Sequence, residues 1–137
     1  MYPETLVIPM KSELTEAGFI DLTTPVAVDN AIKQPGTTLL VFNSVCGCSA
    51  GAARPGLLMS LGSTKKPDHF VTVFAGFDVE ATAQARKYTL PYPPSSPSMA
   101  LFKDGKLVYF IERHRIEGHS ANMVAENLRA AYEEYCS

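Results

Sequence analysis

The sequence predicts a single α/β domain over residues 1–137, with a central mixed β-sheet of about four strands and helices on both faces. A length of 137 residues suits one domain, and apolar residues make up 46% of the chain, enough for an ordinary core. A short apolar run, a helical segment and a second β-rich run follow one another, the order of a right-handed parallel crossover. Two later runs joined by an Asp-Gly turn predict a hairpin, which adds antiparallel strands to the same sheet.

The first half of the chain predicts two helices and a buried strand. Residues 9–17 carry apolar side chains at helical spacing and precede a glycine, so they predict the first helix. Thr24 suits the N-cap and Pro25 the first position of a second helix, which a Gln-Pro-Gly sequence ends after about Lys33. Residues 37–42 form a short, continuous apolar run, typical of a strand buried inside a parallel sheet.

The second half of the chain begins with a predicted helix that contains helix-breaking residues. Residues 49–61 have a helical pattern, but Gly51, Pro55 and Gly56 are expected to bend or interrupt it. The other predicted elements are a strand over residues 70–74, a helix over 79–88, strands over 99–102 and 107–111, and an amphipathic helix over 120–135.

The composition excludes several classes of protein. Lys and Arg total 12 against 14 Asp and Glu, so neither a nucleic-acid nor an anionic membrane partner is expected. The longest apolar runs are too short to cross a bilayer, and the N-terminus lacks the pattern of a signal peptide. Three cysteines are too few for a secreted disulfide scaffold. A reducing cytoplasm is therefore the expected location.

The Cys-Gly-Cys turn is the candidate active site. Cys46 lies between a predicted buried strand and a predicted helix, so it should sit near a helix N-terminus, where backbone N–H groups favour an anion. Cysteine pKa values at such positions fall from about 8.5 toward roughly 3.5–7.5, and the thiolate is the nucleophile of disulfide exchange. We therefore expect Cys46 to be the attacking thiol. The alternative is that two small buried side chains merely happen to be close.

Cys48 is expected either to resolve a disulfide on Cys46 or to tune that thiol. A disulfide between residues i and i+2 closes a tight ring, for which Gly47 supplies backbone freedom, and ring strain would make the oxidised pair relatively oxidising. Ser44 before the turn, and Ser49 after it as a helix cap, are expected to shape the site.

Several segments together resemble one known family, the bacilliredoxins, which are thioredoxin-like proteins. The resemblance covers nearly the whole chain and shows no departure at the cysteines. It implies a thioredoxin-like fold in which Pro97 forms a cis peptide and faces the active cysteine, although sequence alone favours a trans bond. The matching segments are residues 1–4, 9–15, 17–19, 43–48, 96–98, 101–105 and 112–114.

The resemblance also implies a substrate. Bacilliredoxins remove bacillithiol, a low-molecular-weight thiol, from proteins that carry it as a mixed disulfide. Cys46 would attack, release the protein thiol and carry bacillithiol, which free bacillithiol or Cys48 would then clear. No bound cofactor is implied; bacillithiol is the co-substrate, and an upstream reductase supplies the reducing power. Family members have also been regarded as disulfide isomerases, which use the same elementary step.

The serious non-enzymatic alternative is a metal-binding or thiol-sensing module. His69, His114 and His119 could join the cysteines as ligands, but none has a paired ligand spacing or lies near the cysteines in sequence. We therefore predict no metal site.

Three further features are not assigned a role in catalysis. Cys136, the penultimate residue, is expected to be non-catalytic, with an intermolecular disulfide or a third redox thiol as the alternative. The basic cluster over residues 113–115 is interpreted as a solvated edge of a strand. Tyr92, in a proline-rich loop, is a weak candidate for bordering the cysteine turn.

Overall fold

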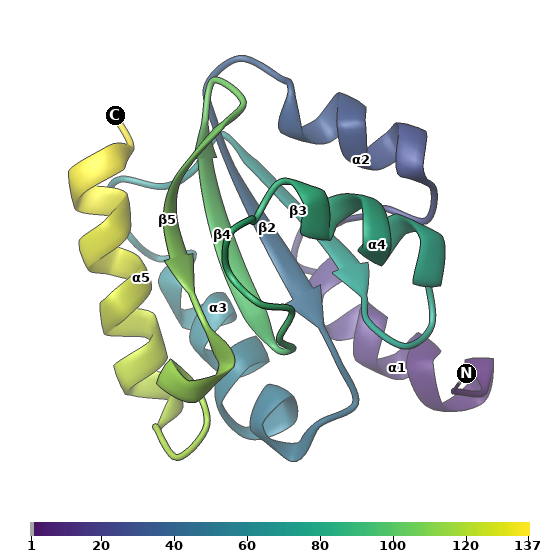
Figure 1. Cartoon of the computed structure of the whole chain (residues 1–137). Helices are drawn as coiled ribbons and strands as arrows, with labels where there is room; N and C mark the ends of the chain where they lie inside the picture. Colours follow the sequence, from purple (N-terminus) through teal and green to yellow (C-terminus); the bar gives the residue numbers. More distant parts are fainter. Residues whose placement is uncertain (1) are drawn as a thin grey trace.

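A five-stranded mixed sheet forms the centre of the molecule (Figure 1), in the computed structural model that describes residues 2–137. The strand order is β1-β3-β2-β4-β5; β1, β3 and β2 are parallel, β4 is antiparallel to β2, and β5 is antiparallel to β4. This confirms the predicted α/β class with a mixed sheet. The strands are β1 (Ile20–Asp21), β2 (Thr37–Asn43), β3 (His69–Phe74), β4 (Ser98–Lys103) and β5 (Lys106–Ile111).

The sheet has one strand more than the sequence predicted, because β1 is only two residues long. Ile20 and Asp21 pair with Val71 and Thr72 of β3 at the edge of the sheet. Ile20 is 62% exposed, so this segment carries neither an apolar run nor an alternation that could reveal it.

The central strand β2 determines where the cysteine turn lies. All seven of its residues are buried, because Leu39 and Val41 face one layer of helices while Leu40 and Phe42 face the other. At its carboxyl end Phe42 pairs with Ser98, the first residue of β4. The register therefore places the end of β2 beside the residue that follows Pro97.

Helices cover both faces of the sheet, as predicted (Figure 1). One core contains side chains of α1, α3 and α5, and the second contains side chains of α2 and α4. No helix within residues 2–137 combines the length and apolar character that a bilayer crossing requires. The helices are α1 (Glu4–Thr15), α2 (Pro25–Ile32), α3 (Arg54–Ser60), α4 (Val79–Lys87) and α5 (Ala121–Tyr135).

The first helix begins five residues earlier than predicted. The sequence placed its start at Pro9, but α1 begins at Glu4 and contains Pro9 in its interior. Val7 and Leu14 are both fully buried, so one face of the helix is held against the core on either side of the proline. This packing outweighs the one intrahelical hydrogen bond that a proline removes.

The helix after the cysteine turn is interrupted, as predicted. A π-helical turn, Ser49–Ala53, leads into α3, and Pro55 occupies the first turn of α3, where its missing N–H costs little. Gly56 lets α3 approach α5 closely, because a Cβ atom there would lie 2.7 Å from Cβ of Val124.

Two local predictions are also confirmed. The side chain of Thr24 accepts a hydrogen bond from the N–H of Ala27 (3.1 Å) and so caps α2, with Pro25 as its first residue. Asp104 and Gly105 both have positive φ angles (50° and 81°), as the tight hairpin between β4 and β5 requires.

Candidate active site

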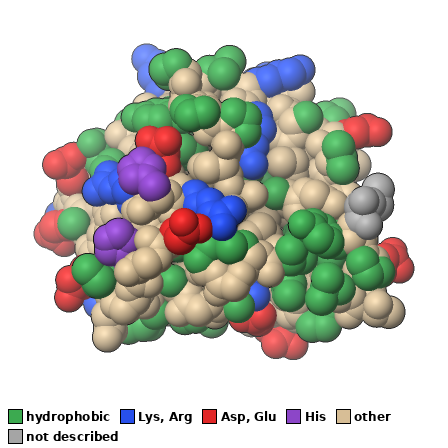
Figure 2. All heavy atoms as spheres, turned by 60° about the horizontal axis from the view of Figure 1, so that its bottom comes forward, with side chains coloured by type: hydrophobic (Ala, Val, Ile, Leu, Met, Phe, Trp, Pro, Cys, Tyr) green, Lys and Arg blue, Asp and Glu red, His purple; other side chains and the backbone are tan. Residues whose placement is uncertain are grey.

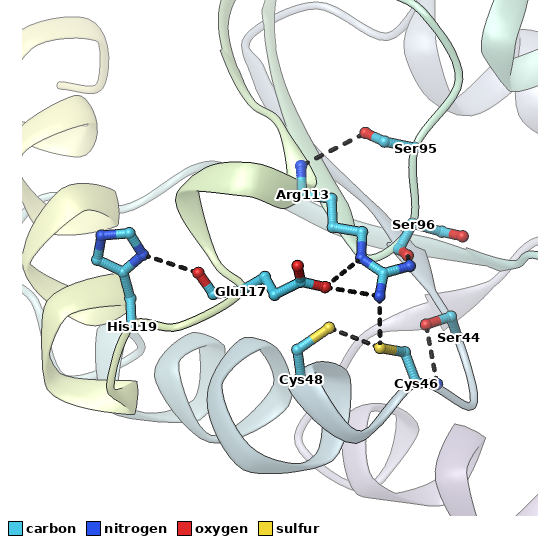
Figure 3. Close-up of polar contacts among 8 residues, drawn as sticks. All are labelled: Ser44, Cys46, Cys48, Ser95, Ser96, Arg113, Glu117 and His119. Atoms are coloured by element: carbon cyan, nitrogen blue, oxygen red, sulfur yellow. Dashed lines mark hydrogen bonds and ion pairs between the residues drawn. The ribbon is translucent and has the colours of Figure 1, made fainter.

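The Cys-Gly-Cys turn lies at the start of the interrupted helix, directly beyond the carboxyl end of β2 (Figure 3). The N–H groups of Ser49 and Ala50 both donate to the carbonyl of Cys46, at 2.9 and 3.3 Å. Helical hydrogen bonding therefore begins at Cys46, which places its side chain at the N-terminus of the helical segment, as the sequence predicted.

The two cysteine sulfurs are adjacent. Sγ of Cys46 and Sγ of Cys48 lie 2.7 Å apart as free thiols, and both residues are half-buried. The two side chains turn toward each other around Gly47, which is exposed (Figure 3). The site thus presents a sulfur within reach of solvent and a second thiol directly behind it.

Arg113 brings a positive charge to this pair. Its Nη2 donates to Sγ of Cys46 at 3.2 Å, and the same nitrogen lies 2.7 Å from Oε2 of Glu117 (Figure 3). Its Nη1 donates to the carbonyl of Ser96 at 3.4 Å. The interpretation of this basic cluster as a solvated edge is wrong for Arg113. Sequence could not show the contact, because Arg113 lies 67 residues after Cys46 and reaches it through a 3₁₀ turn that follows β5.

The environment separates the acidities of the two thiols. A hydrogen bond from the Cys48 thiol, opposed by partial burial, lowers the pKa of Cys46, with the N–H groups of Cys48 and Ser49 and the charge of Arg113 acting in the same direction. Burial, and the thiol's role as donor to Cys46, raise the pKa of Cys48. Cys46 is therefore the thiol that ionises first, and Cys48 is the one that keeps its proton.

The peptide bond before Pro97 is cis, as the family resemblance implied. Pro97 is buried, and the Ser96 carbonyl of this peptide accepts the hydrogen bond from Arg113. The pairing of Ser98 with the end of β2 holds this segment next to the cysteine turn.

A buried arginine ties the strand, the turn and the helix together. The guanidinium of Arg54, 1% exposed, donates from Nη1 to Oδ1 of Asn43, the carbonyl of Ser44 and Oγ of Ser49, at 2.9–3.0 Å. Its Nε forms an ion pair with Oε1 of Glu13 in α1 (3.2 Å). Arg54 was not predicted from the sequence, because it belongs to no motif and lies five residues after Ser49, a spacing that does not bring side chains together on a regular α-helix.

The two serines expected to shape the site are both hydrogen-bonded within it. Oγ of Ser44 accepts from the N–H of Cys46 at 3.3 Å, and Oγ of Ser49 donates to Oδ1 of Asn43 at 3.1 Å. Ser49 is fully buried and does not cap the helix, so that prediction is wrong. Helical hydrogen bonding already begins at Cys46, which leaves Ser49 inside the first turn.

An open hollow of about 230 Å³ adjoins Cys46. Figure 2 looks toward this end of the molecule, where hydrophobic, basic and acidic side chains lie close together. The residues that line the hollow include Tyr2, Gly76, Ser96 and Arg113. Tyr92 does not line this hollow; it packs against the ring of Phe110 instead, so its expected place beside the cysteines is wrong.

Cys136 lies far from the turn. It is 5% exposed, burial raises its pKa, and its neighbour Thr37 begins β2, the strand whose other end leads to Cys46. Seven strand residues span roughly 20 Å, so Cys136 and Cys46 lie at opposite ends of the sheet.

The histidines are not brought to the cysteines. The ring of His69 contacts the carbonyl of Pro35, while His114 and His119 border a different open hollow beside α5. Across residues 2–137, no three His, Cys, Asp or Glu side chains gather as a set of metal ligands.

The fold and the site define a class of protein. A thioredoxin from Halobacterium salinarum superposes with a TM-score of 0.60 over 86% of this chain and 90% of its own, at 20% sequence identity, which shows the thioredoxin fold. The chain is thus a protein of thioredoxin fold with a half-buried pair of thiols after its central strand.

The sequence comparisons narrow the class to a family. The model of the disulphide isomerase family matches residues 2–136. A bacilliredoxin of Cytophaga hutchinsonii is 62% identical over 134 residues, 98% of this chain and 99% of that protein. A bacilliredoxin of Bacillus cereus is 56% identical over 126 residues, 92% of this chain and 88% of that protein. The chain belongs to the bacilliredoxin family, whose members are thioredoxin-like oxidoreductases.

Proposed function

We propose that this protein removes bacillithiol from proteins that carry it as a mixed disulfide, with Cys46 as the nucleophile. The observation that carries the proposal is the arrangement around Cys46: an arginine nitrogen 3.2 Å from its sulfur and a second thiol at 2.7 Å. The first stabilises the attacking thiolate, and the second is placed to resolve the disulfide that the attack creates. The choice of bacillithiol follows from the resemblance to the bacilliredoxins, the name that the relatives carry.

The first step transfers bacillithiol to the enzyme. The Cys46 thiolate attacks the bacillithiol sulfur of the mixed disulfide, whose S–S bond breaks as a new one forms. The protein sulfur leaves as a thiolate and takes up a proton. Cys46 then carries bacillithiol in a disulfide.

The second step clears Cys46 by one of two routes. Cys48 loses its proton and attacks Sγ of Cys46, which closes the Cys46–Cys48 disulfide and releases bacillithiol. Alternatively, a second bacillithiol attacks the bound one, which regenerates Cys46 and produces the bacillithiol disulfide. Both routes end in a disulfide that an upstream reductase must reduce with two electrons. The reaction requires no bound cofactor and suits the cytoplasm, where thiols are kept reduced.

The remaining site residues hold this geometry. Gly47 gives the backbone freedom that ring closure requires, and Pro97 immediately precedes β4, whose first residue pairs with the end of β2. Ser44 and Ser49 fix the turn through the hydrogen bonds to Cys46 and Asn43 described above.

A test protein that carries bacillithiol on a single cysteine distinguishes this activity. The Cys48→Ala variant should accumulate bacillithiol on Cys46 while the test protein is freed, which intact mass spectrometry detects on both partners. The matched control, Cys46→Ala, should show no transfer. An absence of transfer to a reduced, free Cys46 in the Cys48→Ala variant would exclude the proposal.

Disulfide isomerisation is the second candidate, favoured by the description of the matching family model. The elementary step is the same, with a protein disulfide in place of the mixed disulfide. Reactivation of a protein with scrambled disulfides would measure it. Isomerase activity should persist in Cys48→Ala, because Cys46 alone can initiate exchange, and should vanish in Cys46→Ala.

A further inference from the structure

The hollow beside Cys46 has one cationic side chain, Arg113, among the described residues that line it. Of these described residues, Arg113 carries the one charged side chain besides the Cys46 thiolate; the others include Tyr2, Ser44, Gly76 and Ser96. The carboxylate of Glu117 contacts Nε and Nη2 of Arg113 but does not line the hollow. A molecule in the hollow therefore meets the cation without meeting its acidic partner directly.

The position of the hollow matches that of the thiol carried by the enzyme. Cys46 is itself a lining residue, so a group attached to its sulfur can extend into the hollow. The hollow, of about 230 Å³, has room for a small molecule attached to this sulfur. The aromatic ring of Tyr2 closes against Gly76, where a Cβ atom would lie 2.6 Å from Cε2 of the ring.

The charge on Cys46 disappears when that thiol forms a disulfide, and this changes what Arg113 can bind. In the free enzyme, Nη2 is shared between the Cys46 sulfur and Glu117. Once Cys46 carries a thiol its sulfur is neutral, so the guanidinium loses its anionic partner on the side of the hollow. The other terminal nitrogen, Nη1, has only a long contact of 3.4 Å to the Ser96 carbonyl. Arg113 then has hydrogen-bonding capacity for a new anion.

We propose that this hollow is the subsite for the low-molecular-weight thiol on Cys46, and that Arg113 selects thiols bearing a carboxylate or similar anion. The inference rests on the proposed exchange function and adds the chemical class of the thiol. The step is the one already written: the Cys46 thiolate attacks the small thiol's sulfur, the S–S bond breaks, and the departing sulfur leaves as a thiolate. Arg113 binds the anionic group of the half that stays on Cys46.

Three symmetric small disulfides that differ in charge test this selection. The Cys48→Ala variant is mixed with dithiodipropionate (anionic), hydroxyethyl disulfide (neutral) or cystamine (cationic), and intact mass spectrometry follows the adduct on Cys46. Each rate is divided by the rate of the same disulfide with 2-mercaptoethanol, which removes intrinsic reactivity. The normalised rate should be about tenfold higher for the anionic than for the cationic disulfide.

Adding Arg113→Met to the Cys48→Ala background should reduce the anionic-to-cationic ratio to near one. This substitution also makes Cys46 less acidic and slows all three reactions alike, so the ratio, and not the rate, is the readout. The matched control, Arg115→Met, removes an exposed arginine two residues away and should leave the ratio unchanged. A ratio near one with Arg113 present, or a ratio that survives Arg113→Met, would overturn the inference.

The salt dependence of the anionic-to-cationic ratio is a further measurement. Raising NaCl from 50 to 500 mM should lower the anionic-to-cationic ratio of the Cys48→Ala protein, which retains Arg113. This measurement does not require the Arg113→Met variant to fold. A ratio unaffected by salt would contradict the inference. Failure of the two proposals can be distinguished: equal reaction with all three disulfides rejects only the subsite, whereas no reaction with any of them rejects the exchange function as well.

Discussion

At the scale of single residues, the two cysteines have the same side chain but opposite surroundings. Cys46 receives hydrogen bonds and faces a guanidinium, whereas Cys48 is the more desolvated thiol and donates to its neighbour. A low thiol pKa at one position and a raised one at the other are what a nucleophile and a resolving group need. Arg113 contributes to this difference from outside the Cys-Gly-Cys sequence.

Replacing Arg113 with Met should raise the pKa of Cys46, because the thiolate loses a neighbouring positive charge. Thiolate absorbance at 240 nm in a Cys48→Ala background, followed from pH 4 to 10, measures the shift. At a pH below the pKa of Cys46 in the variant, Cys46 should be alkylated about fivefold more slowly in the variant than in its Cys48→Ala parent. Arg115→Met should titrate like the parent. Coincident titration curves for Arg113→Met and the parent would show that the contact does not stabilise the thiolate.

We expect Gly47 to matter for the formation of the Cys46–Cys48 disulfide and not for the reactivity of the reduced site. A Cβ atom at Gly47 would meet nothing within 4 Å, so Gly47→Ala should leave the alkylation rate of Cys46 within about twofold of the parent. The methyl group narrows the backbone conformations that a disulfide between Cys46 and Cys48 demands, so closure after oxidation should be slower. Mass spectrometry of quenched samples gives the closure rate. Unchanged closure would refute this role for Gly47.

At the scale of elements, the site is held by one buried arginine, Arg54, rather than by the turn itself. Arg54 joins the end of β2, the turn and the start of the helix, and its partner Glu13 belongs to α1. One guanidinium thus joins the continuous stretch from Asn43 to Ser49 to a residue of α1 that is distant in sequence. A buried cation of this kind is costly to leave unpaired, and its partners are costly to leave without donors.

Arg54→Met should lower the free energy of unfolding by about 3 kcal/mol, since the buried Ser44 carbonyl loses the arginine donor and Oδ1 of Asn43 loses one of its three donors. Urea denaturation followed by far-UV circular dichroism measures the loss. Arg129→Met is the matched control: Arg129 is exposed and donates only to the Met59 carbonyl, so its removal should cost less than about 0.5 kcal/mol. Equal costs for the two variants would show that the buried network does not stabilise the fold.

At the scale of the whole molecule, the sequence was informative wherever a pattern spans several residues. The β2 run, the capped α2 and the hairpin turn were predicted because apolar runs, caps and Asp-Gly pairs are local signals. The two-residue β1 and the start of α1 were not predicted, because pairing at the sheet edge determines β1 and packing against the core determines where α1 begins. In the site, the two cysteines could be predicted from their spacing in the sequence. Arg113 and Arg54 could not be predicted, because only strand register and helix packing bring them to the turn.

The distance between Cys136 and Cys46, which lie at opposite ends of the sheet, predicts that Cys136 takes no part in thiol exchange. It lies at the end of the sheet opposite Cys46, is 5% exposed, and has a pKa raised by burial. Cys136→Ala should therefore leave the bacillithiol transfer rate within about twofold of the parent, while costing about 1 kcal/mol of stability from lost packing. In the parent, iodoacetamide should modify Cys46 long before Cys136, which should react only as the chain unfolds. A transfer rate that falls tenfold or more in Cys136→Ala, with the fold intact, would instead make Cys136 a third redox thiol.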